Sequence, residues 1–120
     1  MAVREFDLIV IGAGAIGENV ADRAVQGGLT AALVEAELVG GECSYWACMP
    51  SKTLLRPGEA VHAANDAAGT AEVDVDAAFD WRDFMVSNHT DASAEQWLTD
   101  NGIDLVRGTG RLAGTGVVEV

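Results

Sequence analysis

The sequence predicts an α/β fold of three layers, with a central parallel sheet and a small antiparallel extension. The first observation is a pair of apolar, β-branched runs at 6–11 and 29–34, which is typical of strands covered on both faces in a parallel sheet. The second is a series of short strand-like segments between glycines at 103–120, which predicts further strands. With 49% hydrophobic residues, the chain can form one core, so we expect residues 1–120 to be a single domain.

The first 35 residues predict one βαβ unit. The first strand ends at the glycine turn Gly12–Gly17. The helix that follows has apolar residues at the three-to-four spacing of one buried face, namely Ile16, Val20 and Ala24. Gly27–Gly28 then ends the helix before the second strand.

The middle of the chain predicts a loop followed by a helix. The loop covers residues 40–43, and the helix begins near Cys48 because Pro50 suits a first helical turn. The ring of Pro57 cannot continue a regular helix, so this helix either stops or kinks there. Residues 69–76 are expected to connect it to the next element.

Two further helices, or one interrupted helix, are predicted before the terminal strands. Asp80 is the expected N-cap of a helix at 81–86, and Ser93 with Gln96 forms a capping-box pattern for another helix. Five large apolar residues fall at helical spacing and are expected in the core: Trp81, Phe84, Met85, Trp97 and Leu98. Short strands are expected at 103–107, 111–113 and 117–120. Because the last strand has no turn after it, we expect the chain to be truncated.

The charge of the sequence restricts its partners. Its 7 basic and 19 acidic side chains give a net charge of −12, which repels phosphate backbones and anionic lipids. We therefore expect a small-molecule ligand, and neither nucleic acid nor a membrane surface as a partner. The sequence shows no secretory signal and no apolar run of the about 18 residues that a membrane span needs, so we expect a cytoplasmic protein.

The glycine turn and the acid after the second strand predict a dinucleotide site. Gly12 and Gly14 lack a Cβ and so allow a pyrophosphate to approach the backbone, while Gly17 lets the helix lie close to the strand. The helix N-terminus adds unpaired N–H groups and a favourable dipole. Glu35, about 20 residues beyond the turn, can accept hydrogen bonds from ribose hydroxyls and disfavours a 2′-phosphate.

Cys43 and Cys48 form a second candidate site. Four residues separate them, so they can form a disulfide if the turn between them is slightly distorted. Lys52, the only lysine, follows Cys48 by about one helical turn and favours a thiolate, whereas the charge of Glu42 raises a thiolate pKa. In a reducing compartment such a pair is more often catalytic, redox-sensing or metal-binding than structural. Two histidines lack the spacing of a zinc site, so we expect no metal and interpret both as solvated or capping: His62 and His89.

These residues also resemble a known family. The pattern Gly41-x-Cys43-x4-Cys48-x-Pro50-Ser51-Lys52 follows a segment, Asp7–Gly17, that reads DLIVIGAGAIG. Together they resemble the N-terminal FAD-binding part of the pyridine nucleotide-disulfide oxidoreductases, which include dihydrolipoamide dehydrogenase, glutathione reductase and mercuric reductase. The resemblance implies a Rossmann-like FAD-binding domain over residues 1–120, without the later NAD(P)-binding and dimerisation domains. The segment Arg107–Gly110 is similar to the family segment whose backbone touches adenine.

The resemblance implies a role for each motif residue. It assigns FAD contacts to seven of them: Gly12, Gly14 and Gly17 at the pyrophosphate, Glu35 at the adenosine ribose, Gly41 beside the flavin, and Thr109 and Gly110 at the adenine. It implies that Cys48 faces the flavin, that Cys43 attacks the substrate, and that Lys52 lies near the flavin N5. Three residues differ from those usual in the family, namely Glu42, Tyr45 and Ala47.

The implied activity needs more than this chain. The full enzyme, acting as a homodimer, would pass electrons from NAD(P)H through FAD to a disulfide between the two cysteines and then to a disulfide-type substrate. We expect the fragment alone to be inactive. Two other functions fit the residues: a stand-alone dinucleotide-binding module that senses redox state through its cysteines, and an NAD-dependent Rossmann protein in which the cysteines are incidental.

Overall fold

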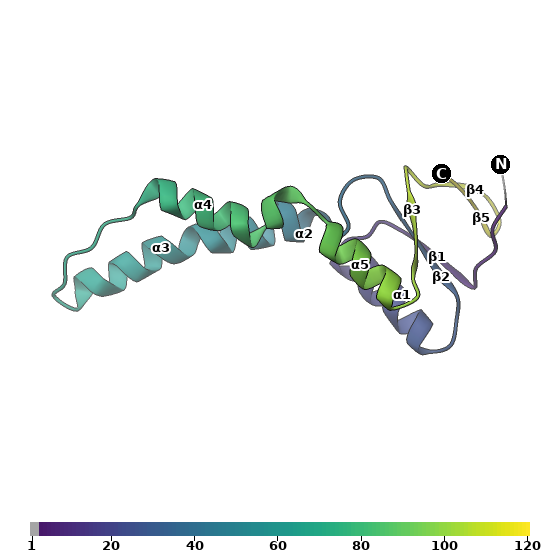
Figure 1. The fold of residues 1–120 in the computed structure, drawn as a ribbon, viewed down its shortest axis with the longest axis horizontal. Helices are drawn as coiled ribbons and strands as arrows, with labels where there is room; N and C mark the ends of the chain where they lie inside the picture. Colours follow the sequence, from purple (N-terminus) through teal and green to yellow (C-terminus); the bar gives the residue numbers. More distant parts are fainter. Residues whose placement is uncertain (1–2) are drawn as a thin grey trace. The chain divides into compact units, whose positions relative to one another are not determined.

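The computed structural model describes residues 3–120, and the chain forms two compact units (Figure 1). The first unit combines the N-terminal segment up to Gly41 with Asp91–Val120. The second unit is Glu42–Thr90. The expectation that residues 1–120 form one FAD-binding domain stays a prediction.

A parallel sheet of three strands is the centre of the first unit. The strands lie in the order β1 (Leu8–Ile11), β2 (Ala31–Glu35) and β3 (Asp104–Arg107), and both neighbouring pairs are parallel. Four residues of the middle strand, 31–34, are buried, as expected for a strand covered on both faces. The α/β class and the parallel sheet predicted from the sequence are therefore confirmed.

The helix α1 (Ala15–Gln26) packs on β1 and β2. Its predicted buried face is wrong in part, because Ile16 is 79% exposed and Val20 is 44% exposed. Ala21 is fully buried instead. Gly17 determines which face of α1 is buried, because it lies against the first strand. Ala21, about one turn further along the same face, is therefore buried as well. The helix ends at Gly27 as predicted, and Gly28 has a φ of +87°, which suits a glycine.

One helix and two strands complete the first unit. The helix α5 (Ala92–Asp100) packs on β3 and lies beside α1 (Figure 1). The strands β4 (Arg111–Gly114) and β5 (Val117–Glu119) form a separate antiparallel sheet, which confirms the small extension. The core of the unit joins residues of the sheet, both helices and the intervening segments: Ala13, Ala21, Ala31, Leu33, Val39, Leu98 and Ile103.

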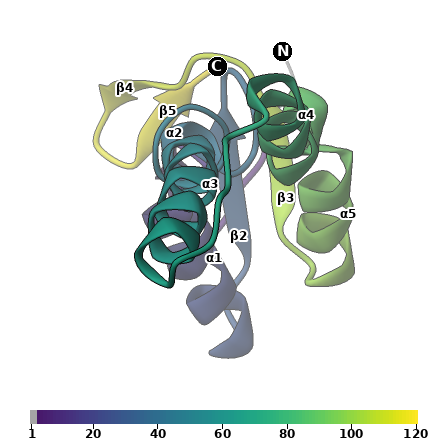
Figure 2. The same cartoon turned by 90° about the vertical axis from the view of Figure 1, so that its left-hand side faces the viewer.

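The second unit is helical. It contains α2 (Gly41–Tyr45, which starts at the last residue of the first unit), α3 (Cys48–Asp66), α4 (Val75–Met85) and the short 3₁₀ turn η1 (Ser87–His89). The helices α3 and α4 pack along each other (Figures 1 and 2). The prediction of a helix start near Cys48 is confirmed. The loop predicted at 40–43 is wrong from Gly41 onward, where α2 begins, and α3 does not stop at Pro57, which lies inside it.

The predicted starts of two helices are wrong. Asp74, not Asp80, caps α4: its carboxylate accepts the N–H of Ala77 at 3.0 Å, so Asp80 lies in mid-helix. The helix α5 begins after Asp91, whose side chain makes no capping bond. The capping box expected of Ser93 with Gln96 is absent from the structure, because Gln96 and Ser93 both lie inside that helix.

The expected core residues are only partly buried. Leu98 is fully buried, and Met85 is half-buried. The three large aromatic residues are not: Trp81 is 50%, Phe84 65% and Trp97 40% exposed. Trp81 and Phe84 stack on each other with ring centroids 5.4 Å apart. Helical spacing therefore predicted the helices but not which of their faces is covered.

Candidate functional site

The glycine turn between β1 and α1 is open for a ligand. A Cβ at Gly12 or Gly14 would have no heavy atom within 4 Å, and Gly12 has a φ of +99°. At Gly17, by contrast, a Cβ would lie 2.0 Å from the carbonyl oxygen of Gly12. Gly14 caps α1 without a side-chain hydrogen bond, so the first turn of this helix presents N–H groups that an anion can bind.

Glu35 lies at the end of β2 and joins that strand to the glycine turn. Its Oε2 accepts the N–H of Ala13 at 2.7 Å, and its Oε1 accepts the N–H of Glu37 at 2.8 Å. Each carboxylate oxygen has a further lone pair that can accept a hydroxyl proton. The side chain is only half-buried, so the carboxylate is both held in place and able to bind a ribose.

A second pair of glycines lies against the first turn. The Gly40 N–H donates to the carbonyl of Ala13 at 2.7 Å, and Gly14 and Gly40 form an isolated parallel bridge. Gly41 has a φ of +61°, and a Cβ there would lie 2.8 Å from the Cα of Gly14. No larger residue fits this position without moving backbone atoms. The structure therefore brings together five predicted residues: Gly12, Gly14, Gly17, Glu35 and Gly41.

The predicted adenine segment reaches the same edge of the sheet. The N–H of Gly108 donates to the carbonyl of Glu35 at 2.9 Å. A Cβ at Gly110 would lie 3.0 Å from Cγ1 of Val34, so this glycine packs tightly on β2. Thr109 is exposed and lines an open hollow of about 500 Å³ beside the antiparallel sheet.

An ionic network that the sequence did not reveal holds the segment after Glu35. The carboxylate of Asp91 accepts the N–H of Val39 at 2.8 Å and also binds Arg107. Arg107 in turn binds Glu95 and donates to the carbonyl of Glu37. Burial raises the pKa of Asp91, but the hydrogen bonds from Arg107 and Val39 and the charge of Arg107 hold that pKa below its ordinary value. Of these residues, the sequence had singled out Arg107 alone, as the first residue of the predicted adenine segment.

Cys43, Cys48 and Lys52 lie together in the second unit. Cys43 is on α2, Cys48 is the first residue of α3, and Lys52 follows one turn later on α3. Both thiols are free and half-buried. Hydrogen bonding with the Cys48 side chain is the main cause that raises the pKa of Cys43, burial adds to it, and the charge of Lys52 opposes it. Glu42, expected to raise a thiolate pKa, is not among these causes.

This electrostatic arrangement predicts how Cys43 titrates. Substituting Cys48→Ala should lower the pH at which Cys43 is half alkylated by iodoacetamide, because it removes the main cause of the raised pKa. Lys52→Met should raise that pH, since the lysine charge favours the thiolate. The rate at Cys43 can be followed by mass spectrometry of the alkylated peptide.

Arg56→Met is the matched control for the lysine substitution. Arg56 lies one turn beyond Lys52 on α3 and does not act on the pKa of Cys43. Its substitution should leave the alkylation profile unchanged. Identical profiles for the parent and the Cys48→Ala protein would contradict the contact between the thiols.

The two histidines differ in their surroundings. The side chain of His62 is 80% exposed and lies 3.5 Å from Asp66, so its expected solvation is confirmed. His89 is half-buried, and its ring stacks on Trp46. Within residues 3–120, no three His, Cys, Asp or Glu side chains are grouped to hold a metal ion. The same part of the chain contains no helix long and apolar enough to cross a bilayer.

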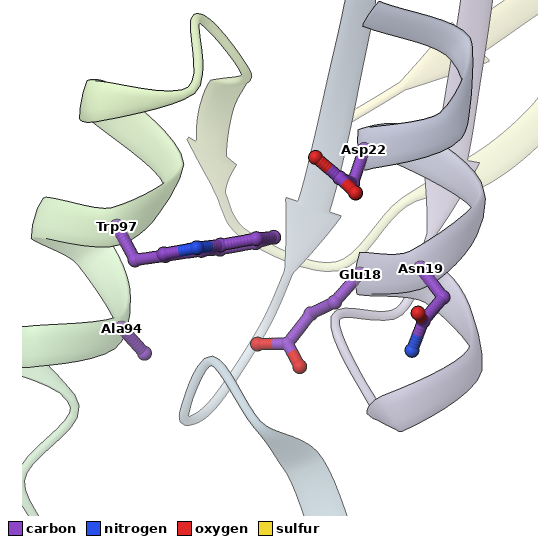
Figure 3. Close-up of a pocket in the computed structure, with 5 residues that line it drawn as sticks. All are labelled: Glu18, Asn19, Asp22, Ala94 and Trp97. Carbon is purple, nitrogen blue, oxygen red and sulfur yellow. The ribbon is translucent and has the colours of Figure 1, made fainter. Parts of the chain in front are cut away.

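The second hollow lies between α1 and α5 and measures about 280 Å³ (Figure 3). Its lining includes the carboxylates of Glu18 and Asp22, with the indole of Trp97 extending toward them (Figure 3). Burial, and secondarily the charge of Glu35, raises the pKa of Glu18. These acids repel a diphosphate, so the hollow is unsuited to a dinucleotide.

Comparison with known proteins assigns the chain to a family. A family model described as pyridine nucleotide-disulphide oxidoreductase matches residues 6–119. The chain belongs to this family. Its members are oxidoreductases, and the resemblance predicted from the glycine and cysteine motifs is confirmed.

Curated members of the family align with almost the whole chain. A dihydrolipoyl dehydrogenase of Thermus scotoductus is 38% identical over 98% of this chain and 26% of its own length. A mercuric reductase of Lysinibacillus sphaericus is 31% identical over 96% of this chain and 22% of its own length. A dihydrolipoyl dehydrogenase of Haloferax volcanii is 34% identical over 95% of this chain and 25% of its own length. The chain therefore spans about a quarter of the length of these family members.

Proposed function

We propose that this chain is the FAD-binding part of a flavin-dependent disulfide oxidoreductase. The observation that carries the proposal is the position of Gly41. This glycine packs against Gly14 of the glycine turn and is also the first residue of α2, on which Cys43 follows two residues later. The chain thus passes within two residues from a dinucleotide cradle to the first of two cysteines, and a dinucleotide coupled to a cysteine pair is what electron transfer to a disulfide requires.

The cradle fits the dinucleotide part of FAD. The open surface at Gly12 and Gly14 and the uncapped start of α1 suit a pyrophosphate. Glu35 suits the adenosine ribose, and the backbone of Thr109 and Gly110, at the same edge, suits the adenine. We assign Gly17 and Gly41 a packing role, because a Cβ at either would strike backbone atoms of the turn.

The thiols carry the electrons to the acceptor. FAD, when bound, supplies the two-electron chemistry that connects NAD(P)H to a disulfide. Reduction of a Cys43–Cys48 disulfide takes two electrons and two protons and leaves two thiols. The Cys43 thiolate then attacks a disulfide-type acceptor and releases one thiol, and Cys48 displaces the second by re-forming the bond to Cys43. Lys52 favours the thiolate form that this attack needs. The whole enzyme is proposed to be a homodimer.

Flavin binding tests the proposal directly. The purified full chain should bind FAD, with a visible flavin absorbance, in preference to NAD. Glu35→Gln should weaken FAD binding about tenfold, because a charged hydrogen-bond acceptor for the ribose is lost. Glu37→Gln is the matched control, since its side chain is exposed and only its backbone N–H contacts Glu35.

Electron transfer needs the longer protein. In a chain that includes the nicotinamide-binding part, adding NAD(P)H should produce a long-wavelength absorbance band that Cys48→Ser abolishes. A band that survives this substitution would reverse the roles given to the two cysteines. A colourless chain that binds NAD would favour the NAD-dependent alternative, and FAD binding without electron transfer in the longer protein would favour a sensor.

A further inference from the structure

The turn that follows α4 has an unusual backbone. Ser87, Asn88 and His89 have φ values of +53°, +50° and +56°. Left-handed residues other than glycine are uncommon and usually single, because their Cβ crowds the next carbonyl. Three in succession persist only when the surrounding structure holds them, and such turns concentrate at functional positions.

The turn places His89 on the indole of Trp46. The two ring centroids are 4.5 Å apart and the ring planes are inclined by 31°. His89 is half-buried, and its own N–H donates to the carbonyl of Val86 at 2.9 Å. The strained turn therefore positions His89 against Trp46, a residue far away in the sequence.

Trp46 lies in the bend between the two cysteines. The N–H groups of Trp46 and Ala47 both donate to the carbonyl of Glu42, at 2.9 and 2.7 Å. This bend ends α2 and leads directly to Cys48, the first residue of α3. Its conformation therefore decides whether the thiol on α2 can meet the thiol on α3. Cys48 is the main influence on the pKa of Cys43, which indicates that the bend brings the two thiols close together.

We propose that His89 is a positioning residue: by stacking on Trp46 it holds the bend in the form in which Cys43 and Cys48 meet, and so stabilises their disulfide. The inference rests on the proposed function, in which this pair cycles between dithiol and disulfide. Disulfide formation removes two electrons and two protons from the thiols, and a thiol–disulfide reagent accepts them. A bend held in place raises the effective concentration of each thiol at the other and shifts this equilibrium toward the disulfide.

The test measures that equilibrium in the full-length chain with mixtures of reduced and oxidised glutathione. His89→Ala should shift it about fivefold toward the dithiol, equivalent to about 20 mV in potential. His89→Phe should restore the parent value, because a phenyl ring can stack in the same way. Trp46→Leu should match His89→Ala, and the double variant should add no further shift, because both act through one contact.

Asn88→Gly is the matched control. This substitution removes strain from the turn and keeps both rings, so its dithiol–disulfide equilibrium constant should stay within twofold of the parent value. Values within twofold of the parent for both His89→Ala and Trp46→Leu, in proteins with parental circular dichroism, would overturn the inference, as would a His89→Phe protein as impaired as His89→Ala. A parent that forms no Cys43–Cys48 disulfide would instead overturn the proposed function itself.

Discussion

Substituting Gly17→Ala is expected to destabilise the first unit by about 3 kcal/mol. The new Cβ would lie 2.0 Å from the carbonyl oxygen and 3.1 Å from the carbonyl carbon of Gly12. Both are backbone atoms, so the clash can be relieved only if α1 moves away from the glycine turn. Alanine favours a helix over glycine by about 1 kcal/mol, which is too little to offset the clash. Urea unfolding followed by circular dichroism measures the loss.

Gly58→Ala is the matched control for this prediction. Gly58 also lies inside a helix, α3, but a Cβ there would have no heavy atom within 4 Å. Its substitution should stabilise the chain slightly, by up to about 1 kcal/mol, through helix propensity alone. If Gly17→Ala unfolded at the parental urea concentration, the close approach of helix and turn would be wrong. The Gly17→Ala protein should also bind FAD more weakly, because the displaced helix moves the proposed pyrophosphate site.

The parts of the fold that local patterns determine could be predicted from the sequence. The βαβ unit follows from two apolar runs, a glycine turn and a strand-end acid, all within 35 residues. The contact between Glu35 and the glycine turn lies within the same short segment. The helix that begins at Cys48 could also be predicted, because the proline in its first turn is a local signal.

The helix caps could not be predicted in this way. Asp74, Asp76 and Asp80 are all possible N-caps, and the sequence does not say which of them accepts a backbone N–H. The structure selects Asp74, which lengthens α4 by about one and a half turns beyond the expected helix. Asp91 precedes α5, but its carboxylate is taken by Val39 and Arg107, so it caps nothing.

The contacts that complete the candidate site are long-range. Val39 and Asp91 are 52 residues apart, and Trp46 and His89 are 43 apart. No periodicity links such pairs, and both contacts depend on how complete elements pack. The sequence could therefore predict the candidate site residues. The residues that hold them in position could be identified only from the structure.

The Asp91 network yields the second prediction with a large effect. Asp91→Asn should destabilise the first unit at neutral pH by about 2 kcal/mol, because Arg107 and Val39 lose a charged hydrogen-bond acceptor. The folded-state pKa of Asp91 is depressed, so the stability that its carboxylate contributes is fully present above the unfolded-state pKa of about 4. That contribution is lost as the pH falls further, through the folded-state pKa. The parent should therefore lose this increment of stability on acidification, and Asp91→Asn should not.

Amide hydrogen exchange gives the most specific readout of this network. The N–H of Val39 is hydrogen-bonded by Asp91, so its exchange should accelerate in Asp91→Asn more than that of buried amides in β2. Arg107→Lys keeps the charge but cannot bind Asp91, Glu95 and the carbonyl of Glu37 together. It should therefore lower the stability and accelerate the exchange of Val39, in both cases less than Asp91→Asn does. Asp80→Asn, an exposed position on α4, should change neither quantity. Parental Val39 exchange in Asp91→Asn would show that the segment between Glu35 and Gly41 is held without the hydrogen bond to Asp91.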